Sequence, residues 1–300
     1  MLNKIQEFLD YTTPVTYSAN AKADTSYLRH FTLDFFTSFD GLNRVLTILA
    51  RGYLFRDGEP DIIQAKRALL AWSSMAFSNT FQDLYGMKQL PGLASQHLMA
   101  QGYGYGGEGD WKVAAMTTIM KAMGEGGNGA SAFMEDYTYH LEAGNEYSLG
   151  AHMLEVCPSL AADKPRIEVH PLGIGDREAP ARLVFEGKAG DAIVVSLVDM
   201  GGRLRLIVQD IHCVKPIMPM PNLPVARVMW VAEPSLTKGL ECWITAGGAH
   251  HTVLSYDVSA EQMRDWARMM DIEFVHITKD TTVASLEQEL FLNDLAWKLK

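Results

Sequence analysis

The sequence has little cysteine and no excess of basic residues, and both absences exclude whole classes of protein. Only three of its 300 residues are cysteines, Cys157, Cys213 and Cys242, and none forms a Cys-x-x-Cys pair. A disulfide framework and a thiolate zinc site are therefore not indicated. The formal net charge is −10, and no Lys/Arg-rich block offsets it locally. This balance argues against nucleic acid as a partner.

Long apolar runs are also missing. No stretch reaches the length that a transmembrane helix needs. The first residues carry charges at Lys4, Glu7 and Asp10, so they lack the uninterrupted apolar region of a signal peptide. We therefore expect a cytoplasmic protein that does not interact with membranes. A composition of 48% hydrophobic and 21% charged residues is typical of a globular protein with a substantial core.

The pattern of residues changes twice along the chain. Residues 1–80 are predicted to be mostly helical, with helices at 40–52 and 61–75. Residues 81–157 are rich in glycine and contain one predicted helix at 111–123. From about residue 165, short runs of β-branched residues dominate. The predicted strands are 167–170, 182–185, 192–199, 204–210, 225–231, 242–245, 251–256 and 272–277.

Turn and capping signals complete the prediction. Gly201-Gly202 predicts a hairpin between two of these strands, and Ser259-Ala-Glu-Gln262 is a capping box that opens a helix. A last helix is predicted at 283–299. We expect an α+β fold with a helical and mixed α/β part at 1–160 and an antiparallel, barrel-like β-rich domain at 161–300. The first part carries Glu108, Glu135 and His152, and the second carries His250 and His251.

Two carboxylates and two imidazoles, in four short segments, could meet around one divalent metal. Taken singly, each has an ordinary explanation. Glu108 precedes a helix, where its charge would favour the positive end of the dipole. Glu135 stands beside Asp136 as a solvated acidic pair would, and His152 could be a satisfied, partly buried histidine. Together, two oxygen and two nitrogen ligands would suit Mn, Co, Fe or Zn.

The pair His250-His251 is harder to explain as structural, because it follows two glycines inside an apolar, β-rich stretch. Neighbouring residues of a strand face opposite ways, so only one of them is expected to bind a metal directly. The other would contact substrate or support the ligands. His212, beside Cys213, is the competing candidate, and spacing alone does not decide between them.

From about Phe81 to the C-terminus, the chain resembles the L-arabinose isomerase family. The shared motifs are Phe81-Gln-Asp-Leu, Lys88-Gln-Leu-Pro-Gly-Leu, Gly104-Tyr-Gly-Gly-Glu-Gly-Asp-Trp-Lys, Glu135-Asp-Tyr-Thr-Tyr-His, His152-Met-Leu-Glu-Val-Cys-Pro, Leu172-Gly-Ile-Gly and Ala246-Gly-Gly-Ala-His-His-Thr. The resemblance implies a Mn²⁺ ion, with Co²⁺ or another divalent metal as the alternative. It implies that the metal ligands are Glu108, Glu135, His152 and His251. It also implies that Phe81, Tyr137, Met153 and His250 lie near the sugar.

The implied reaction is conversion of L-arabinose to L-ribulose, with D-galactose to D-tagatose as a second reaction. A proton would move between C2 and C1 through an enediolate that the metal stabilises. Glu108 and Glu135 are the candidate catalytic carboxylates, and which of them takes the proton is open. The resemblance also implies a homo-oligomer with a small sugar as its substrate.

One departure from the family pattern supports an alternative. The family's N-terminal α/β domain is not recognisable in residues 1–80, so we expect a shortened chain. The second hypothesis is accordingly a non-catalytic metal- or sugar-binding homologue, or an assembly partner of a longer subunit. A hydrolase or epimerase with the same ligand set is a third, because fold alone does not decide function.

Overall fold

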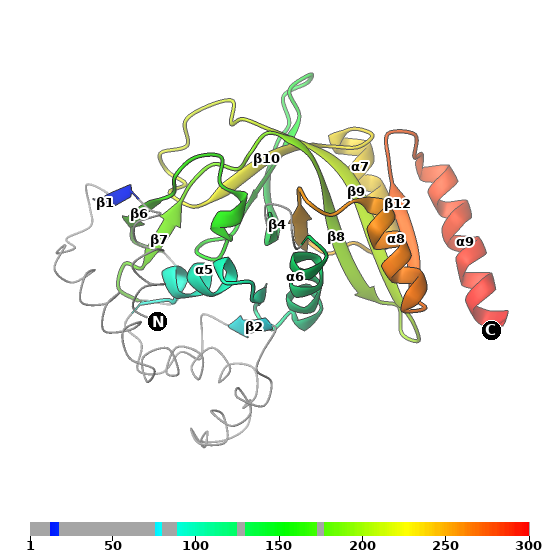
Figure 1. Ribbon diagram of the computed structural model, residues 1–300. Helices are drawn as coiled ribbons and strands as arrows, with labels where there is room; N and C mark the ends of the chain where they lie inside the picture. The colour runs from blue at the N-terminus through cyan, green and yellow to red at the C-terminus, as the bar shows by residue number, and fades with distance from the viewer. Residues whose placement is uncertain (1–12, 18–75, 80–88, 125–129, 173–176, 300) are drawn as a thin grey trace, which may run out of the picture.

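The computed structural model describes residues 13–17, 76–79, 89–124, 130–172 and 177–299. Within these ranges, helices and strands are mixed along the chain, and the helices flank a large sheet (Figure 1). The α+β class predicted from the sequence is confirmed. The predicted helices at 40–52 and 61–75 lie outside the described residues, and the division at residue 160 stays a prediction.

A seven-stranded sheet forms the centre of the described fold. Its strands are β4 (Ser131–His140), β5 (Tyr147–Ala151), β8 (Gly190–Asp199), β9 (Leu204–Val214), β10 (Arg227–Ala232), β11 (His251–Ser255) and β12 (Glu273–Ile277). They are hydrogen-bonded in the order β10-β5-β4-β11-β8-β9-β12, and β10 also pairs with β9. The pairings therefore close a ring, in which every pair is antiparallel. The barrel-like form stays a prediction.

Two small sheets lie beside the large one. In the first, β1 (Thr13–Tyr17) runs parallel to β6 (Arg166–Val169), which pairs with the antiparallel β7 (Ala181–Val184). In the second, β2 (Ala76–Asn79) runs parallel to β3 (Gly104–Gly107). Helix α5 (Gly92–Ala100) packs against β7 and β3. These elements occupy the left side of Figure 1 and bring β3 close to β4.

Several local predictions are confirmed. Helix α6 (Trp111–Met123) has the predicted bounds, and α9 (Val283–Leu299) closes the chain as expected. Helix α8 (Ala260–Met269) begins with both hydrogen bonds of the capping box formed by Ser259 and Gln262. The hairpin between β8 and β9 turns at Gly201, whose φ of 80° suits glycine.

The prediction of a strand at 242–245 is wrong, because these residues belong to helix α7 (Leu236–Ala246). Its buried residues include Leu236, Gly239, Trp243 and Ala246, which recur at helical spacing. The Ser235 side chain accepts a hydrogen bond from the third residue of the helix, and Gly247 ends it with a left-handed φ of 92°. These signals at the two ends, rather than the β-branched run between them, define the element.

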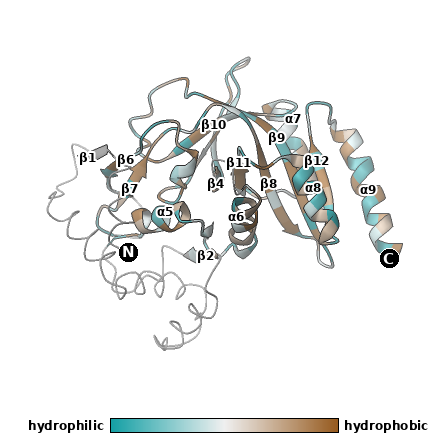
Figure 2. Ribbon diagram, in the orientation of Figure 1, coloured by the Kyte–Doolittle hydropathy of each residue, from teal (hydrophilic) through white to brown (hydrophobic). Residues whose placement is uncertain are grey.

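The core lies between the sheet and the helices on its outer faces. Helix α6 packs against β4, β8 and β11, and α8 packs against β9 and β12. Strand β8 is buried without interruption from Ala192 to Val198, so both of its faces are covered. The brown of β8 and the teal outer face of α8 show this division (Figure 2). No helix in the described ranges is long and apolar enough to cross a membrane.

A cluster of ion pairs attaches α9 to the sheet. Glu273, at the start of β12, pairs with Arg203 Nε at 2.6 Å and with Arg205 Nε at 3.0 Å. Both arginines also pair with Asp294 of α9. Arg205 further donates a hydrogen bond to the Ala246 carbonyl at 2.8 Å. This cluster therefore joins α7, α9 and two strands at one point.

Candidate metal centre

Glu108 lies in the tight turn between β3 and α6. Its φ is 57°, a left-handed value that is uncommon for any residue other than glycine. The turn is held by a hydrogen bond from the Gly109 amide to Ser78 Oγ at 2.8 Å. It is also held by the Asp110 side chain, which accepts a bond from the Val113 amide and caps α6. Such strained backbone is concentrated at functional sites, and here it presents a carboxylate at the surface.

Strand register brings the other candidates together. Glu135 of β4 lies directly opposite His251 of β11 on one side and Ala151 of β5 on the other. His152 follows Ala151, at the point where β5 ends. Gly107, next to Glu108, lies so close that an added Cβ would be 3.3 Å from His152 Nε2. The four predicted ligands, which are far apart in the sequence, therefore come from adjoining parts of the fold.

Three of the site residues have potential ligand atoms within 4.8 Å of one another, namely Glu135, His250 and His251. The two other predicted ligands adjoin this group. The ring centroids of His152 and His251 are 5.8 Å apart. The charge of Glu108 acts on both Glu135 and His152. His250, which was predicted to contact sugar, thus also lies within ligand distance of the group.

Phe133 packs against His152 and His251. It is fully buried on β4, two residues before Glu135. Its ring centroid is 4.9 Å from that of His152 and 5.1 Å from that of His251, in edge-on arrangements. Tyr105 of β3 packs edge-on against the same ring at 5.1 Å. One aromatic side chain therefore holds the two imidazoles on the side away from solvent.

Burial and neighbouring charges shift the pKa values of the site. Burial raises the pKa of Glu135, and Glu108 and Asp136 act in the same direction, against the opposing effect of His152 and His250. Burial, together with the positive charges of His250 and His152, lowers the pKa of His251 to about 3. His251 is therefore neutral at ordinary pH and keeps a free lone pair, as a metal ligand must.

His152 differs from His251 because it has a carboxylate partner. Its Nδ1 lies 2.6 Å from Glu155 Oε2. Burial alone would lower the pKa of His152, but the charge and hydrogen bond of Glu155 outweigh it, and the pKa is raised.

The donor set fits a divalent ion of intermediate hardness. Glu108 and Glu135 would offer oxygen ligands, and His152 and His251 would offer nitrogen ligands, a combination that suits Mn²⁺, Co²⁺, Fe²⁺ or Zn²⁺. The competing candidate, His212, is exposed and hydrogen-bonds to the exposed Asp191. In the described part of the chain, no group of potential ligands was found around it.

Three of the four residues predicted to lie near a sugar are among the described residues. A register shift in β4 leaves Tyr137 as an extra residue between Asp136 and Thr138, and such bulges redirect side chains next to active sites. The Tyr137 hydroxyl is directed to Met153 Sδ at 3.9 Å. Two predicted sugar neighbours are thus in contact, while Phe81 lies outside the described residues.

Three residues of the site were not assigned a role from the sequence. They are Glu155, which contacts His152, Phe133, which supports both histidines, and Asp110, whose carboxylate lies 3.9 Å from His251 Nδ1. Glu155 lies in the motif that begins at His152, and Asp110 lies in the motif that contains Glu108. Their negative charge beside predicted metal ligands was the signal in the sequence that could have identified them. Phe133 had no signal beyond its place in an apolar run.

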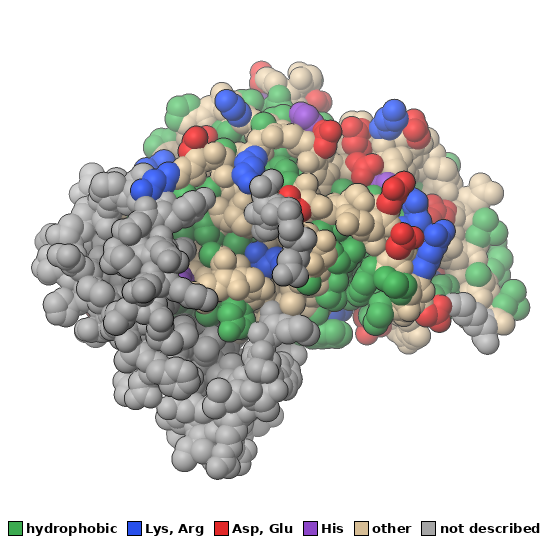
Figure 3. Space-filling view, viewed as in Figure 1, with side chains coloured by type: hydrophobic (Ala, Val, Ile, Leu, Met, Phe, Trp, Pro, Cys, Tyr) green, Lys and Arg blue, Asp and Glu red, His purple; other side chains and the backbone are tan. Residues whose placement is uncertain are grey.

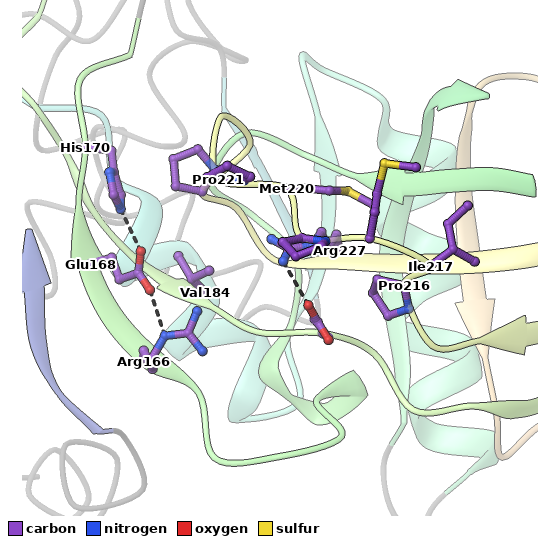
Figure 4. A pocket seen from close by; sticks show the side chains of 13 residues that line it. Arg166, Glu168, His170, Val184, Pro216, Ile217, Met220, Pro221 and Arg227 are labelled. Carbon is purple, nitrogen blue, oxygen red and sulfur yellow. Dashed lines mark hydrogen bonds and ion pairs between the residues drawn. The ribbon is translucent and has the colours of Figure 1, made fainter. Parts of the chain in front are cut away.

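A separate surface pocket of about 510 Å³ contains none of these residues. It is lined by β6, by Arg227 of β10 and by the proline- and methionine-rich loop before β10 (Figure 4). Its charged side chains are paired with one another. Arg166 and His170 bind Glu168, and Arg227 binds Glu186.

Comparison with known proteins identifies two domains. Residues 60–126 match the L-arabinose isomerase central domain, and residues 130–273 match the L-arabinose isomerase C-terminal domain. The match therefore begins before Phe81, where the sequence motifs first suggested a resemblance.

Individual relatives agree with the domain matches. The chain is 59% identical over 235 residues to L-arabinose isomerase 1 of Bacillus licheniformis, which covers 78% of this chain and 47% of the relative. It is 59% identical over 223 residues to L-arabinose isomerase of Geobacillus stearothermophilus, covering 74% and 45%. For the enzyme of Bacillus subtilis the identity is 57% over 225 residues, covering 75% and 45%. The chain thus spans about half the length of the curated relatives it matches.

Proposed function

Because the chain belongs to the L-arabinose isomerase family, we propose that it is a metal-dependent aldose-ketose isomerase that converts L-arabinose to L-ribulose. The relatives carry that name, but the chain spans only about half of their length. The activity is therefore our proposal for this chain. The observation that supports it most is the register of β4, β5 and β11, which sets Glu135 opposite His251 and beside the end of β5, where His152 follows.

In this proposal, Glu108, Glu135, His152 and His251 hold a Mn²⁺ ion, with Co²⁺ or another divalent metal as a substitute. When bound, the ion supplies Lewis-acid polarisation of the sugar carbonyl. Glu108 and Glu135 are the two candidates for the group that takes a proton from C2 and returns it to C1, while a hydroxyl proton passes from O2 to O1. One of the two carboxylates performs the carbon proton transfer, and variants of each identify which.

The remaining site residues bind and orient the sugar. Tyr137 and Met153 form one wall through their mutual contact. His250 is exposed immediately before β11, where it is available to bind a hydroxyl or assist ring opening. Phe81 and Tyr137 would pack on the sugar and exclude water. D-Galactose is the proposed second substrate, giving D-tagatose.

The proposal includes a homo-oligomeric, cytoplasmic protein. Exposed apolar side chains on α9 support an oligomeric state, because a run of them on one helix is typical of an interaction surface. They are Phe291, Leu292, Leu295 and Leu299. Figure 3 shows hydrophobic side chains at the right edge, where α9 lies, and mixed charges in the neighbouring region of α8.

A ketose assay tests the proposed function. The purified chain is incubated with L-arabinose or D-galactose, with and without Mn²⁺, and the ketose is measured. We expect product only with the metal, and we expect Glu135→Gln to abolish it. The matched control is Glu142→Gln, an exposed residue in the turn after the same strand, which should leave activity unchanged.

Two other outcomes would decide against catalysis. Stoichiometric Mn²⁺ binding by folded protein without any ketose would favour the non-catalytic homologue or assembly partner. If the folded protein showed no Mn²⁺ binding and no turnover, the proposed metal site itself would be rejected.

A further inference from the structure

The two ring nitrogens of His152 have different surroundings. Nδ1 lies 2.6 Å from Glu155 Oε2. Nε2 faces the opposite way, toward the turn that carries Glu108, since an added Cβ on Gly107 would lie 3.3 Å from it. One nitrogen is therefore occupied by a carboxylate, and the other is directed at the candidate metal centre.

Glu155 is held in place independently of His152. It is only 6% exposed. The Leu154 amide donates to the same Oε2 atom at 3.1 Å. The buried guanidinium of Arg182 also interacts electrostatically with Glu155, while donating hydrogen bonds to the carbonyls of Met153 and His170. The carboxylate is thus a fixed reference point against which the imidazole can be oriented.

An ionised carboxylate can only accept a hydrogen bond, so Nδ1 must carry the hydrogen in this contact. In neutral imidazole the other nitrogen then has the free lone pair. We propose that Glu155 is a positioning residue that fixes His152 in the Nδ1–H tautomer with Nε2 directed at the metal. This inference rests on the proposed function. Carboxylates that orient histidine ligands in this way raise their basicity and their affinity for metal.

The sequence offers a matched control in a second buried pair. Glu168 accepts a hydrogen bond from His170 at 2.7 Å (Figure 4). It also interacts electrostatically with Arg182. Each glutamate therefore has a histidine partner of its own, and both have Arg182 as a neighbour. His170, however, lines the surface pocket and is no part of the metal centre. Glu155→Gln and Glu168→Gln remove the same charge from similar surroundings.

The first measurement uses metal-free protein. The tautomer of His152 is read at alkaline pH from ¹⁵N NMR of the full chain, with the signals assigned by comparison with His152→Gln. We expect Nδ1–H in the wild type and in Glu168→Gln. In Glu155→Gln, we expect a mixture of both tautomers, because an amide can either donate or accept. An unchanged tautomer in Glu155→Gln, or Nε2–H in the wild type, would overturn the inference.

The second measurement separates this inference from the proposed function. Mn²⁺ affinity is measured by calorimetry, and Glu155→Gln should weaken it about 10- to 100-fold. Glu168→Gln should not change it. A wild type that binds no Mn²⁺ would reject the metal centre, while the tautomer still decides whether Glu155 orients His152. Tight Mn²⁺ binding that Glu155→Gln leaves unchanged would count against the positioning role alone.

Discussion

Replacing Phe133 by leucine should reduce both the stability of the protein and its affinity for metal. The ring is fully buried and makes edge-on contacts with Tyr105, His152 and His251 at centroid distances of 5.1, 4.9 and 5.1 Å. Leucine keeps most of the buried apolar volume but cannot make these aromatic contacts. The substitution therefore tests whether the core positions the ligands.

The magnitudes follow from the contacts. Each aromatic pair contributes about 0.5–1.5 kcal/mol beyond the burial of area. Some of this is regained as leucine repacks, so Phe133→Leu should lower the free energy of unfolding by about 2 kcal/mol. Metal binding must then immobilise each histidine that the Phe133 ring no longer holds, at a free-energy cost of about 0.5 kcal/mol per side chain. Two histidines give about 1 kcal/mol, or a Mn²⁺ affinity reduced roughly fivefold.

The assay combines urea denaturation with calorimetric Mn²⁺ titration, both on folded protein. Phe77→Leu is the control, because Phe77 also packs against Tyr105, at 5.1 Å, whereas the ring contacts of the two histidines within the described residues do not include Phe77. It should lower stability and leave the affinity unchanged. If Phe133→Leu binds Mn²⁺ as tightly as the wild type while losing stability, the ring supports only the core and our reasoning is refuted.

Three further predictions concern other parts of the fold. Glu273→Gln leaves two arginines without their buried carboxylate and should lower the free energy of unfolding by about 3 kcal/mol, whereas Asp294→Asn, half exposed, should change the urea midpoint little. The pKa of Glu168 is lowered because hydrogen bonds from its partners outweigh the effect of burial. The stabilising contribution of the Glu168 carboxylate is therefore present above its usual pKa and is lost as the pH falls below it. Between about pH 6 and about pH 3, the free energy of unfolding from urea titrations should therefore fall less in Glu168→Gln than in the wild type. Gly106→Ala would place Cβ 2.1 Å from the Asp110 carbonyl and should weaken both stability and Mn²⁺ binding, whereas Gly202→Ala, with open space around it, should leave both unchanged in the same assays.

Local signals were sufficient where a segment determines its own structure. Helix α6 and the capping box of α8 were predicted with their observed residues, because their caps and apolar spacing lie within a few positions of each other. The strand predicted at 242–245 failed for the opposite reason. Its β-branched residues are a small part of α7, whose ends are set by Ser235 and Gly247 outside the run.

The candidate site was only partly predictable, because its contacts depend on register. Sequence spacing did not show that Glu135 would lie opposite His251, since that pairing joins strands that are distant in the chain. The roles of Phe133 and Glu155 likewise depend on what packs beside them. Here the family resemblance supplied the candidate residues, and the fold supplied their proximity.

Mn²⁺ binding by the wild type and by single variants of the four predicted ligands tests the central claim most directly. Calorimetry on folded protein should give one ion per chain. Glu108→Gln, Glu135→Gln, His152→Gln and His251→Gln should each weaken binding strongly, while His212→Gln should bind like the wild type. Unchanged Mn²⁺ affinity in all four ligand variants would contradict the claim that these residues form one metal centre.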